Sequence, residues 1–477
     1  MKKNKTILFF IPLLLSCSGN THAGESAGNE DTMTSQNIST NTPVSPDSFP
    51  TGQVINNIAC KNDVSLSYAL YIPKTNEKTL PVIYFFDPHA GGSLPLKKYA
   101  ALADKFHFIL IGSNNSKNGN DWPTTDHIWN ILFDDIKARV MIDVNRVYVC
   151  GFSGGAKVAS YLALRNTNIK NVIACGAALP DGTPAGNFNF SFTGIAGKGD
   201  MNMTDLIATD NAFDKTQTLH RLILFDGKHE WPPESVMNTA FAGLQLDAMR
   251  NGLIKKDDAF INAQMADLKT QVENFLKQNK LTDAAKLCDL AAHLFNGISA
   301  DTLWFNERKK TLLSDPAFQK QNQLEQSLFS KEQNIKADFM NHFQQADKNY
   351  WVSTISSLNE KAKAHAPEAA MNQRLLAYLS LAFYSFSNRA INSSMNDDAD
   401  YFVDLYKIAD PTNSEAWYFS AIMNARHGNA KATESDLNKA IDNGFNDKAR
   451  MMQQQEFQSI ASQMNMQSLE NKMNSMQ

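Results

Sequence analysis

Two kinds of hydrophobic pattern alternate between residues 53 and 250. Runs of consecutive apolar residues occur at 82–86, 108–112, 146–150, 172–175, 192–196 and 222–225. Such runs are typical of parallel strands that are buried on both faces. Helical segments are expected between them, at about 97–105, 126–140 and 155–165. Strands that alternate with helices predict an α/β fold, in which helices cover a mostly parallel sheet.

Residues 64–71 have a different pattern, because polar and apolar side chains alternate there. Alternation with a period of two predicts a strand with one exposed face, which is typical of antiparallel pairing. We therefore expect one antiparallel strand before the parallel ones.

The pattern changes again near residue 250. Residues 251–477 have apolar side chains at three- and four-residue spacing and contain only four of the 23 glycines and three of the 16 prolines. Because both residue types are avoided inside helices, this region is predicted to be an all-α domain. Residues 275–295 predict a helical hairpin.

One part of the helical region resembles a tetratricopeptide repeat (TPR). The matching residues are Trp417, Ala421, Gly428, Leu437 and Ala440. Small residues at such positions let paired helices pack closely. The resemblance implies a TPR-like stack of helix pairs, which could bind a protein partner or serve only as a structural support.

The N-terminus is typical of a secreted protein. A short basic stretch precedes the apolar run 7–15, which is too short to span a bilayer. The run ends before Cys17, and the sequence there resembles a bacterial lipobox, in which the cysteine is lipidated. We therefore expect a lipoprotein signal peptide at 1–16 and a flexible, Ser/Thr/Asn-rich tether at 17–52. The mature chain would contact the membrane through its lipid anchor only.

Composition and charge narrow the possible functions. The formal net charge is −4, which does not favour a nucleic-acid partner. Five cysteines in 477 residues cannot form a disulfide framework.

By resemblance to other bacterial lipoproteins, Ser18 after the lipidated cysteine favours the outer membrane, so we expect a location in the cell envelope.

The strongest motif follows the predicted strand at 146–150. Residues 151–155 read Gly-Phe-Ser-Gly-Gly, and a predicted helix comes next. This is G-x-S-x-G in a strand–turn–helix context, where glycines permit the tight turn that exposes a nucleophile. Ser153 is the candidate nucleophile. The competing interpretation is that Ser153 only caps a helix in an inactive hydrolase.

A serine nucleophile needs a base, and the base needs an acid that orients it. Asp200 and His229 each follow a predicted strand, at 192–196 and 222–225. His220 precedes its strand and would lie at the opposite edge of the sheet, so His229 is the better base. Asp226 is the nearest rival to Asp200, but it is only three residues from His229.

These motifs make residues 53–250 resemble the α/β-hydrolase superfamily, nearest to its compact esterase, polyhydroxyalkanoate-depolymerase and dienelactone-hydrolase-like branches. The resemblance implies that Ser153 is the nucleophile, Asp200 the acid and His229 the general base. It also implies an oxyanion hole formed by the N–H of Gly154 and one N–H from the loop at 87–92. Pro88 has no N–H, so His89 or Ala90 is the expected second donor.

The sequence therefore predicts a lipid-anchored serine hydrolase, most simply a carboxylesterase that forms an acyl-enzyme. It needs no metal or cofactor, and a small or carbohydrate-linked ester is the expected substrate. Two alternatives remain open. One is a serine peptidase of the same fold, and the other is an inactive lipoprotein whose region 251–477 binds a protein partner.

Overall fold

The computed structural model describes residues 47–343 and 346–475 of the chain. The predicted signal peptide and Cys17 lie outside the described residues. The chain divides into two units by its internal contacts. The first unit runs to Gly197 and continues from Asn202 to Asn322, and the second comprises Lys198–Met201 and Gln323–Gln477.

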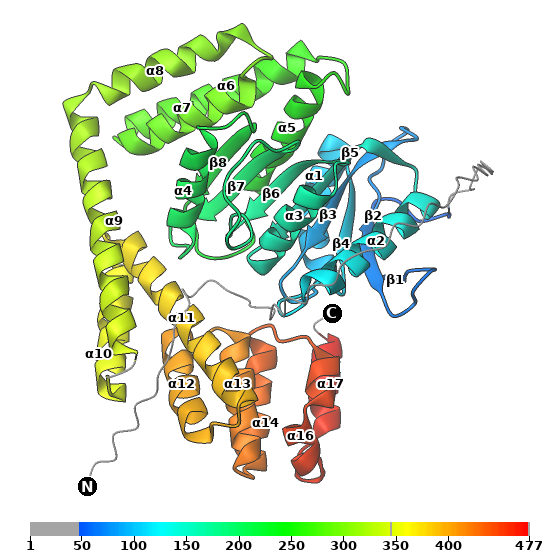
Figure 1. Cartoon of the computed structure of the whole chain (residues 1–477), viewed down its shortest axis with the longest axis vertical. Helices are drawn as coiled ribbons and strands as arrows, with labels where there is room; N and C mark the ends of the chain where they lie inside the picture. Colours follow the sequence, from blue (N-terminus) through cyan, green and yellow to red (C-terminus); the bar gives the residue numbers. More distant parts are fainter. Residues whose placement is uncertain (1–46, 344–345, 476–477) are drawn as a thin grey trace, which may run out of the picture. The chain divides into compact units, whose positions relative to one another are not determined.

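The first unit is built around an eight-stranded sheet with the order β1-β2-β4-β3-β5-β6-β7-β8 (Figure 1). The strands are β1 (Val54–Ala59), β2 (Ser67–Tyr71), β3 (Leu80–Phe86), β4 (Ile109–Ser113), β5 (Ile142–Phe152), β6 (Ile169–Cys175), β7 (Ser191–Gly197) and β8 (His220–Phe225). β2 is antiparallel to both β1 and β4, and β3 to β8 are parallel to one another. This is the mostly parallel sheet of an α/β-hydrolase fold, so the predicted fold class is confirmed.

The six apolar runs form the strands β3 to β8, and β3 is buried along its whole length. Its side chains alternate between two helical layers, because Phe85 packs on Tyr99 of α1 whereas Tyr84 packs on Trp129 of α2. Helices α1 and α5 cover one face, and α2, α3 and α4 cover the other (Figure 1). Their bounds are α1 (Ser93–Phe106), α2 (Trp122–Arg139), α3 (Gly154–Arg165), α4 (Met203–Phe213) and α5 (Glu234–Arg250).

The start of the sheet differs from the prediction. The alternating segment at 64–71 forms a strand only from Ser67 onward, as β2. β1 was not predicted, because Asn56 and Asn57 interrupt its apolar pattern and a register irregularity separates Ile55 from Ile58. Asp47, which falls in the predicted tether, accepts a hydrogen bond from Arg139 Nε at 2.7 Å.

The first unit continues into the helical region. It includes α6 (Asp258–Lys277), α7 (Leu281–Phe295), α8 (Leu303–Leu313) and the start of α9 (Pro316–His342). The predicted helical hairpin is confirmed as α6 and α7. Residues of both helices share a hydrophobic core with Phe241 of α5. The compositional change at residue 250 therefore marks a change of secondary structure, whereas the compact unit extends to Asn322.

The second unit is helical apart from the short segment Lys198–Met201. After α9 it contains α10 (Lys348–Lys363), α11 (Ala369–Asn392), α12 (Asn396–Ala409), α13 (Ser414–Arg426), α14 (Ala430–Asp442), α15 (Lys448–Gln453), α16 (Gln455–Ile460) and α17 (Met466–Ser475). The segment expected to be TPR-like forms the pair α13 and α14, with Gly428 at φ +72° in the turn. Ala421, Leu437 and Ala440 are buried in this pair. The TPR resemblance itself stays a prediction.

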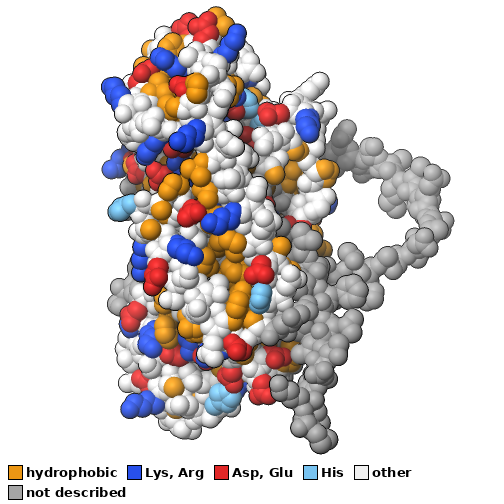
Figure 2. All heavy atoms as spheres, turned by 90° about the vertical axis from the view of Figure 1, so that its left-hand side faces the viewer, with side chains coloured by type: hydrophobic (Ala, Val, Ile, Leu, Met, Phe, Trp, Pro, Cys, Tyr) orange, Lys and Arg blue, Asp and Glu red, His pale blue; other side chains and the backbone are white. Residues whose placement is uncertain are grey.

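Acidic and basic side chains are interspersed on the face drawn in Figure 2, and apolar side chains are exposed between them. Within 47–343 and 346–475, none of the helices is both long enough and apolar enough to cross a bilayer.

Candidate active site

Ser153 lies between the end of β5 and the start of α3, in an unusual backbone conformation with φ 53° and ψ −120°. The glycines of the motif make this turn possible. A Cβ on Gly151 would lie 2.0 Å from the carbonyl oxygen of Gly155, and a Cβ on Gly155 would lie 1.9 Å from that of Phe86. Because both obstructing atoms are backbone atoms, no side-chain movement could make room. The turn therefore projects the Ser153 side chain at the carboxyl end of β5.

His229 lies in the loop after β8, and its Nε2 is 2.9 Å from Ser153 Oγ. The imidazole packs on the ring of Phe152, with 4.6 Å between the ring centroids. Phe152 also contacts Trp231 at 5.5 Å. The structure thus brings the predicted nucleophile and the predicted base within hydrogen-bond distance, and aromatic packing orients the imidazole.

Asp200 follows β7 by three residues, and β7 pairs in parallel with β8 with Gly197 opposite Phe225. The loops that carry Asp200 and His229 therefore leave neighbouring strands at the same edge of the sheet. A Cβ on Gly197 would lie 2.4 Å from the carbonyl oxygen of Lys228, so glycine is required for the close approach of the histidine loop. Asp226, the rival of Asp200, is exposed.

The loop after β3 was expected to supply the second oxyanion donor. Its amides are engaged by Asp87, because the N–H of His89 donates to Oδ1 at 2.9 Å and the N–H of Ala90 donates to the Asp87 carbonyl at 3.2 Å. Neither is therefore free to bind an oxyanion in this conformation. Gly154 is the first residue of α3, where no carbonyl of the same helix can accept from its N–H.

Asp87 is a residue of this region that sequence reasoning missed. Its side chain is buried, and its Oδ2 accepts a hydrogen bond from Trp231 Nε1 at 2.8 Å. Trp231 is two residues after His229, so this bond ties the base's loop to the loop after β3. The two residues are 144 positions apart, and no local pattern indicates the pair.

Asn118 was also missed by sequence reasoning. Its N–H donates to the Pro88 carbonyl at 2.8 Å. A Cβ on Gly154 would lie 1.9 Å from Asn118 Oδ1, so the asparagine side chain lies directly beside Gly154.

Two tryptophans and two cysteines of the first unit lie in different surroundings. Trp129 is buried against Tyr84, whereas Trp122 is 41% exposed and stacks on Tyr161. Cys150 and Cys175 lie on the neighbouring strands β5 and β6 and are buried free thiols.

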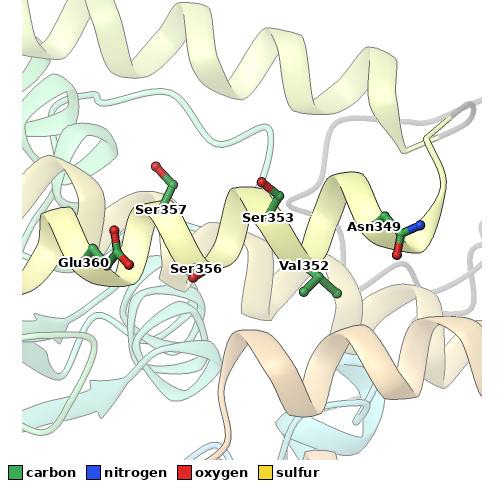
Figure 3. A pocket seen from close by; sticks show the side chains of 6 residues that line it. All are labelled: Asn349, Val352, Ser353, Ser356, Ser357 and Glu360. Carbon is green, nitrogen blue, oxygen red and sulfur yellow. The ribbon is translucent and has the colours of Figure 1, made fainter.

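A hollow of about 470 Å³ in the second unit lies along one side of α10 (Figure 3). Its lining is mostly polar and comprises Asn349, Val352, Ser353, Ser356, Ser357 and Glu360. No imidazole lies in this lining to activate its serines, whereas Ser153 has His229 Nε2 at 2.9 Å.

Comparisons with known proteins find similar solved structures but no matching sequence. Neither a protein-family model nor a curated protein sequence matches the chain. Among solved structures, the chain is similar to FphF, a fluorophosphonate-binding serine hydrolase of Staphylococcus aureus, with 11% identity, a TM-score of 0.34, and coverage of 41% of this chain and 99% of that one. It is also similar to an esterase of Pyrobaculum calidifontis, with 11% identity, a TM-score of 0.33, and coverage of 42% and 85%.

A third similar structure is a ferulic acid esterase, with 16% identity, a TM-score of 0.32, and coverage of 39% and 94%. At these identities and scores, the assignment depends on the sheet order and on the turn at Ser153. The first unit has the sheet order and the strand–turn–helix at Ser153 of an α/β-hydrolase fold.

Proposed function

We propose that this protein is a serine hydrolase that cleaves carboxylic esters, with Ser153 as the nucleophile and His229 as the general base. The observation that carries the proposal is the 2.9 Å distance between Ser153 Oγ and His229 Nε2, at a nucleophile held at φ 53°. A serine hydroxyl is a weak nucleophile until a base accepts its proton. Serine at a strained position opposite an imidazole is the arrangement that acyl transfer requires.

In the proposed reaction, Ser153 Oγ attacks the ester carbonyl carbon while His229 Nε2 takes the hydroxyl proton. The N–H of Gly154 donates to the oxyanion that forms. As the intermediate collapses, the ester C–O bond breaks and the imidazolium returns its proton to the departing alcohol. Water then attacks the acyl-enzyme by the same route and releases the carboxylic acid.

Asp200 is the proposed acid that orients His229. Its place after β7, beside the strand that precedes His229, supports this role. The exposed Asp226 is a poorer candidate, because a carboxylate in water stabilises an imidazolium less strongly.

A small or carbohydrate-linked ester is the proposed substrate class. Within the described residues, the connection from Cys175 of β6 to Ser191 of β7 contains no helix that could form a lid. This favours a small ester over a long-chain lipid. The side chain of Asn118 lies beside Gly154 and offers hydrogen bonds to a polar substrate.

Hydrolysis of p-nitrophenyl acetate by the tagless mature chain tests the proposal. Ser153→Ala and His229→Gln should each reduce kcat by at least about 10³-fold, because the pair acts as a unit. Ser160→Ala is the matched control, since Ser160 lies in α3, the helix that follows Ser153, and its buried hydroxyl has no hydrogen-bond partner among the described residues. Full turnover in either of the first two variants would reject the assignment.

We also propose that Cys17 carries the lipid and that the protein is anchored in the cell envelope, at the outer membrane. The basic stretch, the apolar run and the position of the cysteine support this proposal. Metabolic labelling with an alkyne palmitate should mark the wild-type chain and not Cys17→Ala. Equal labelling of the two chains would contradict it.

A further inference from the structure

A second cluster of polar side chains lies at the opposite end of β8 from His229. His220 is the first residue of β8, and the Ser153–His229 pair lies beyond its last residue. Asp214 follows the last turn of α4, and His293 lies in the last turn of α7. One ligand atom from each of these three side chains lies within 4.8 Å of the other two.

Backbone carbonyls fix the tautomers of both imidazoles. His220 Nδ1 lies 3.0 Å from the carbonyl oxygen of Thr218, and His293 Nδ1 lies 2.9 Å from that of His220 itself. Because carbonyl oxygens only accept hydrogen bonds, each Nδ1 must carry the hydrogen. Each neutral ring then presents a lone pair at Nε2, which is how metal-binding histidines are oriented.

The arrangement around His220 Nε2 needs a positive charge. This atom lies 3.1 Å from Asp214 Oδ1 and 3.8 Å from Asp210 Oδ1. A lone pair of a neutral imidazole would face carboxylate oxygens, which also only accept. A cation bound between His220 Nε2 and Asp214 Oδ1 removes the conflict.

Asp210 adds negative charge beside the three ligands. Its Oδ1 is buried, has no hydrogen-bond partner among the described residues and lies 3.8 Å from His220 Nε2. The neighbouring Lys309 is itself paired with Asp289. A cation bound at His220 would face this oxygen and compensate its charge.

We propose that His220, His293 and Asp214 bind one divalent transition-metal ion. Two imidazole nitrogens with a carboxylate oxygen suit Zn²⁺ better than Mg²⁺ or Ca²⁺, which prefer oxygen ligands. The three ligands come from the end of α4, from α7 and from the start of β8, so the ion would fasten these elements together.

The proposal is tested on the tagless full-length mature chain after removal of metal with a chelator. Titration with Zn²⁺ should show one bound equivalent and a higher Tm, and Co²⁺ should give the visible absorption of tetrahedral coordination. His293→Gln and Asp214→Asn remove ligands that are only partly buried or exposed, so these variants should still fold. Each should weaken Zn²⁺ binding by at least about tenfold.

His127→Gln is the matched control, because His127 is an exposed histidine of the same unit that pairs with Asp63. It should bind Zn²⁺ as the wild type does. Binding of less than one equivalent, or wild-type affinity in His293→Gln and Asp214→Asn, would overturn the proposal.

Discussion

The hydrogen bond between Trp231 Nε1 and Asp87 Oδ2 makes a quantitative prediction about the candidate active site. Asp87 is 5% exposed, and its other carboxylate oxygen already accepts from the N–H of His89 and of Gly91. Trp231→Phe keeps an aromatic ring beside Phe152 but removes the donor at 2.8 Å. Hydrogen bonds to charged groups contribute about 1.5–3 kcal/mol, so we expect a loss of that size in the free energy of unfolding.

Activity should fall as well, because Trp231 holds the loop of His229 against the loop after β3. A displacement of the base by about 1 Å can cost roughly 100-fold, so we expect kcat/KM for p-nitrophenyl acetate to drop by roughly 10- to 100-fold. Urea titration followed by residual esterase activity measures the stability of the catalytic unit in the full chain.

Trp122→Phe is the control for this prediction. Trp122 is 41% exposed and stacks on Tyr161, so the same chemical change there should alter the free energy of unfolding by less than about 1 kcal/mol. A double-mutant cycle with Asp87→Asn isolates the coupling of the pair. The reasoning is refuted if Trp231→Phe matches the wild type in both stability and kcat/KM.

Two further substitutions test other parts of the first unit. Gly197→Ala should reduce activity strongly, because its Cβ would lie 2.4 Å from the Lys228 carbonyl oxygen, whereas Gly186→Ala meets only the ring of Phe188 at 3.3 Å and should retain activity. Comparable kinetics for the two alanine variants would contradict this. Asp247→Asn should cost about 3–5 kcal/mol at pH 7, because it leaves the buried Arg221 unpaired. Burial alone would raise the pKa of Asp247, but Arg221 and Arg250 hold it below its ordinary value. Such a carboxylate stabilises the fold above its unfolded pKa and loses that effect as the pH falls through its folded pKa, so the cost should shrink below about pH 4 in urea titrations. A cost independent of pH would count against this ion pair.

The parts of the fold that could be predicted are those encoded locally. A parallel strand such as β3 has to be apolar on both faces, so its residues form an unbroken run. The turn at Ser153 is also local, because glycines two residues to either side avoid clashes with nearby backbone. β1 escaped prediction because it is an exposed edge strand with polar residues, which no periodicity marks.

Long-range pairings could not be predicted. The bond from Trp231 to Asp87 and the approach of His293 to His220 join residues 144 and 73 positions apart. Each of these residues stands alone in the sequence, far from its partner. Only the packing of strands and helices brings the partners together. The hydrogen bonds from the His89 and Ala90 amides to Asp87 could not be predicted either, because they depend on the conformation of the loop.

The most direct test of the central claim is the site at which a fluorophosphonate reacts. The tagless mature chain is treated with the probe, and the adduct is located by peptide mass spectrometry. The proposed nucleophile predicts one adduct per chain, on Ser153, with labelling lost in Ser153→Ala and greatly slowed in His229→Gln. An adduct on another residue, or ester hydrolysis that persists with Ser153 unmodified, would contradict the account.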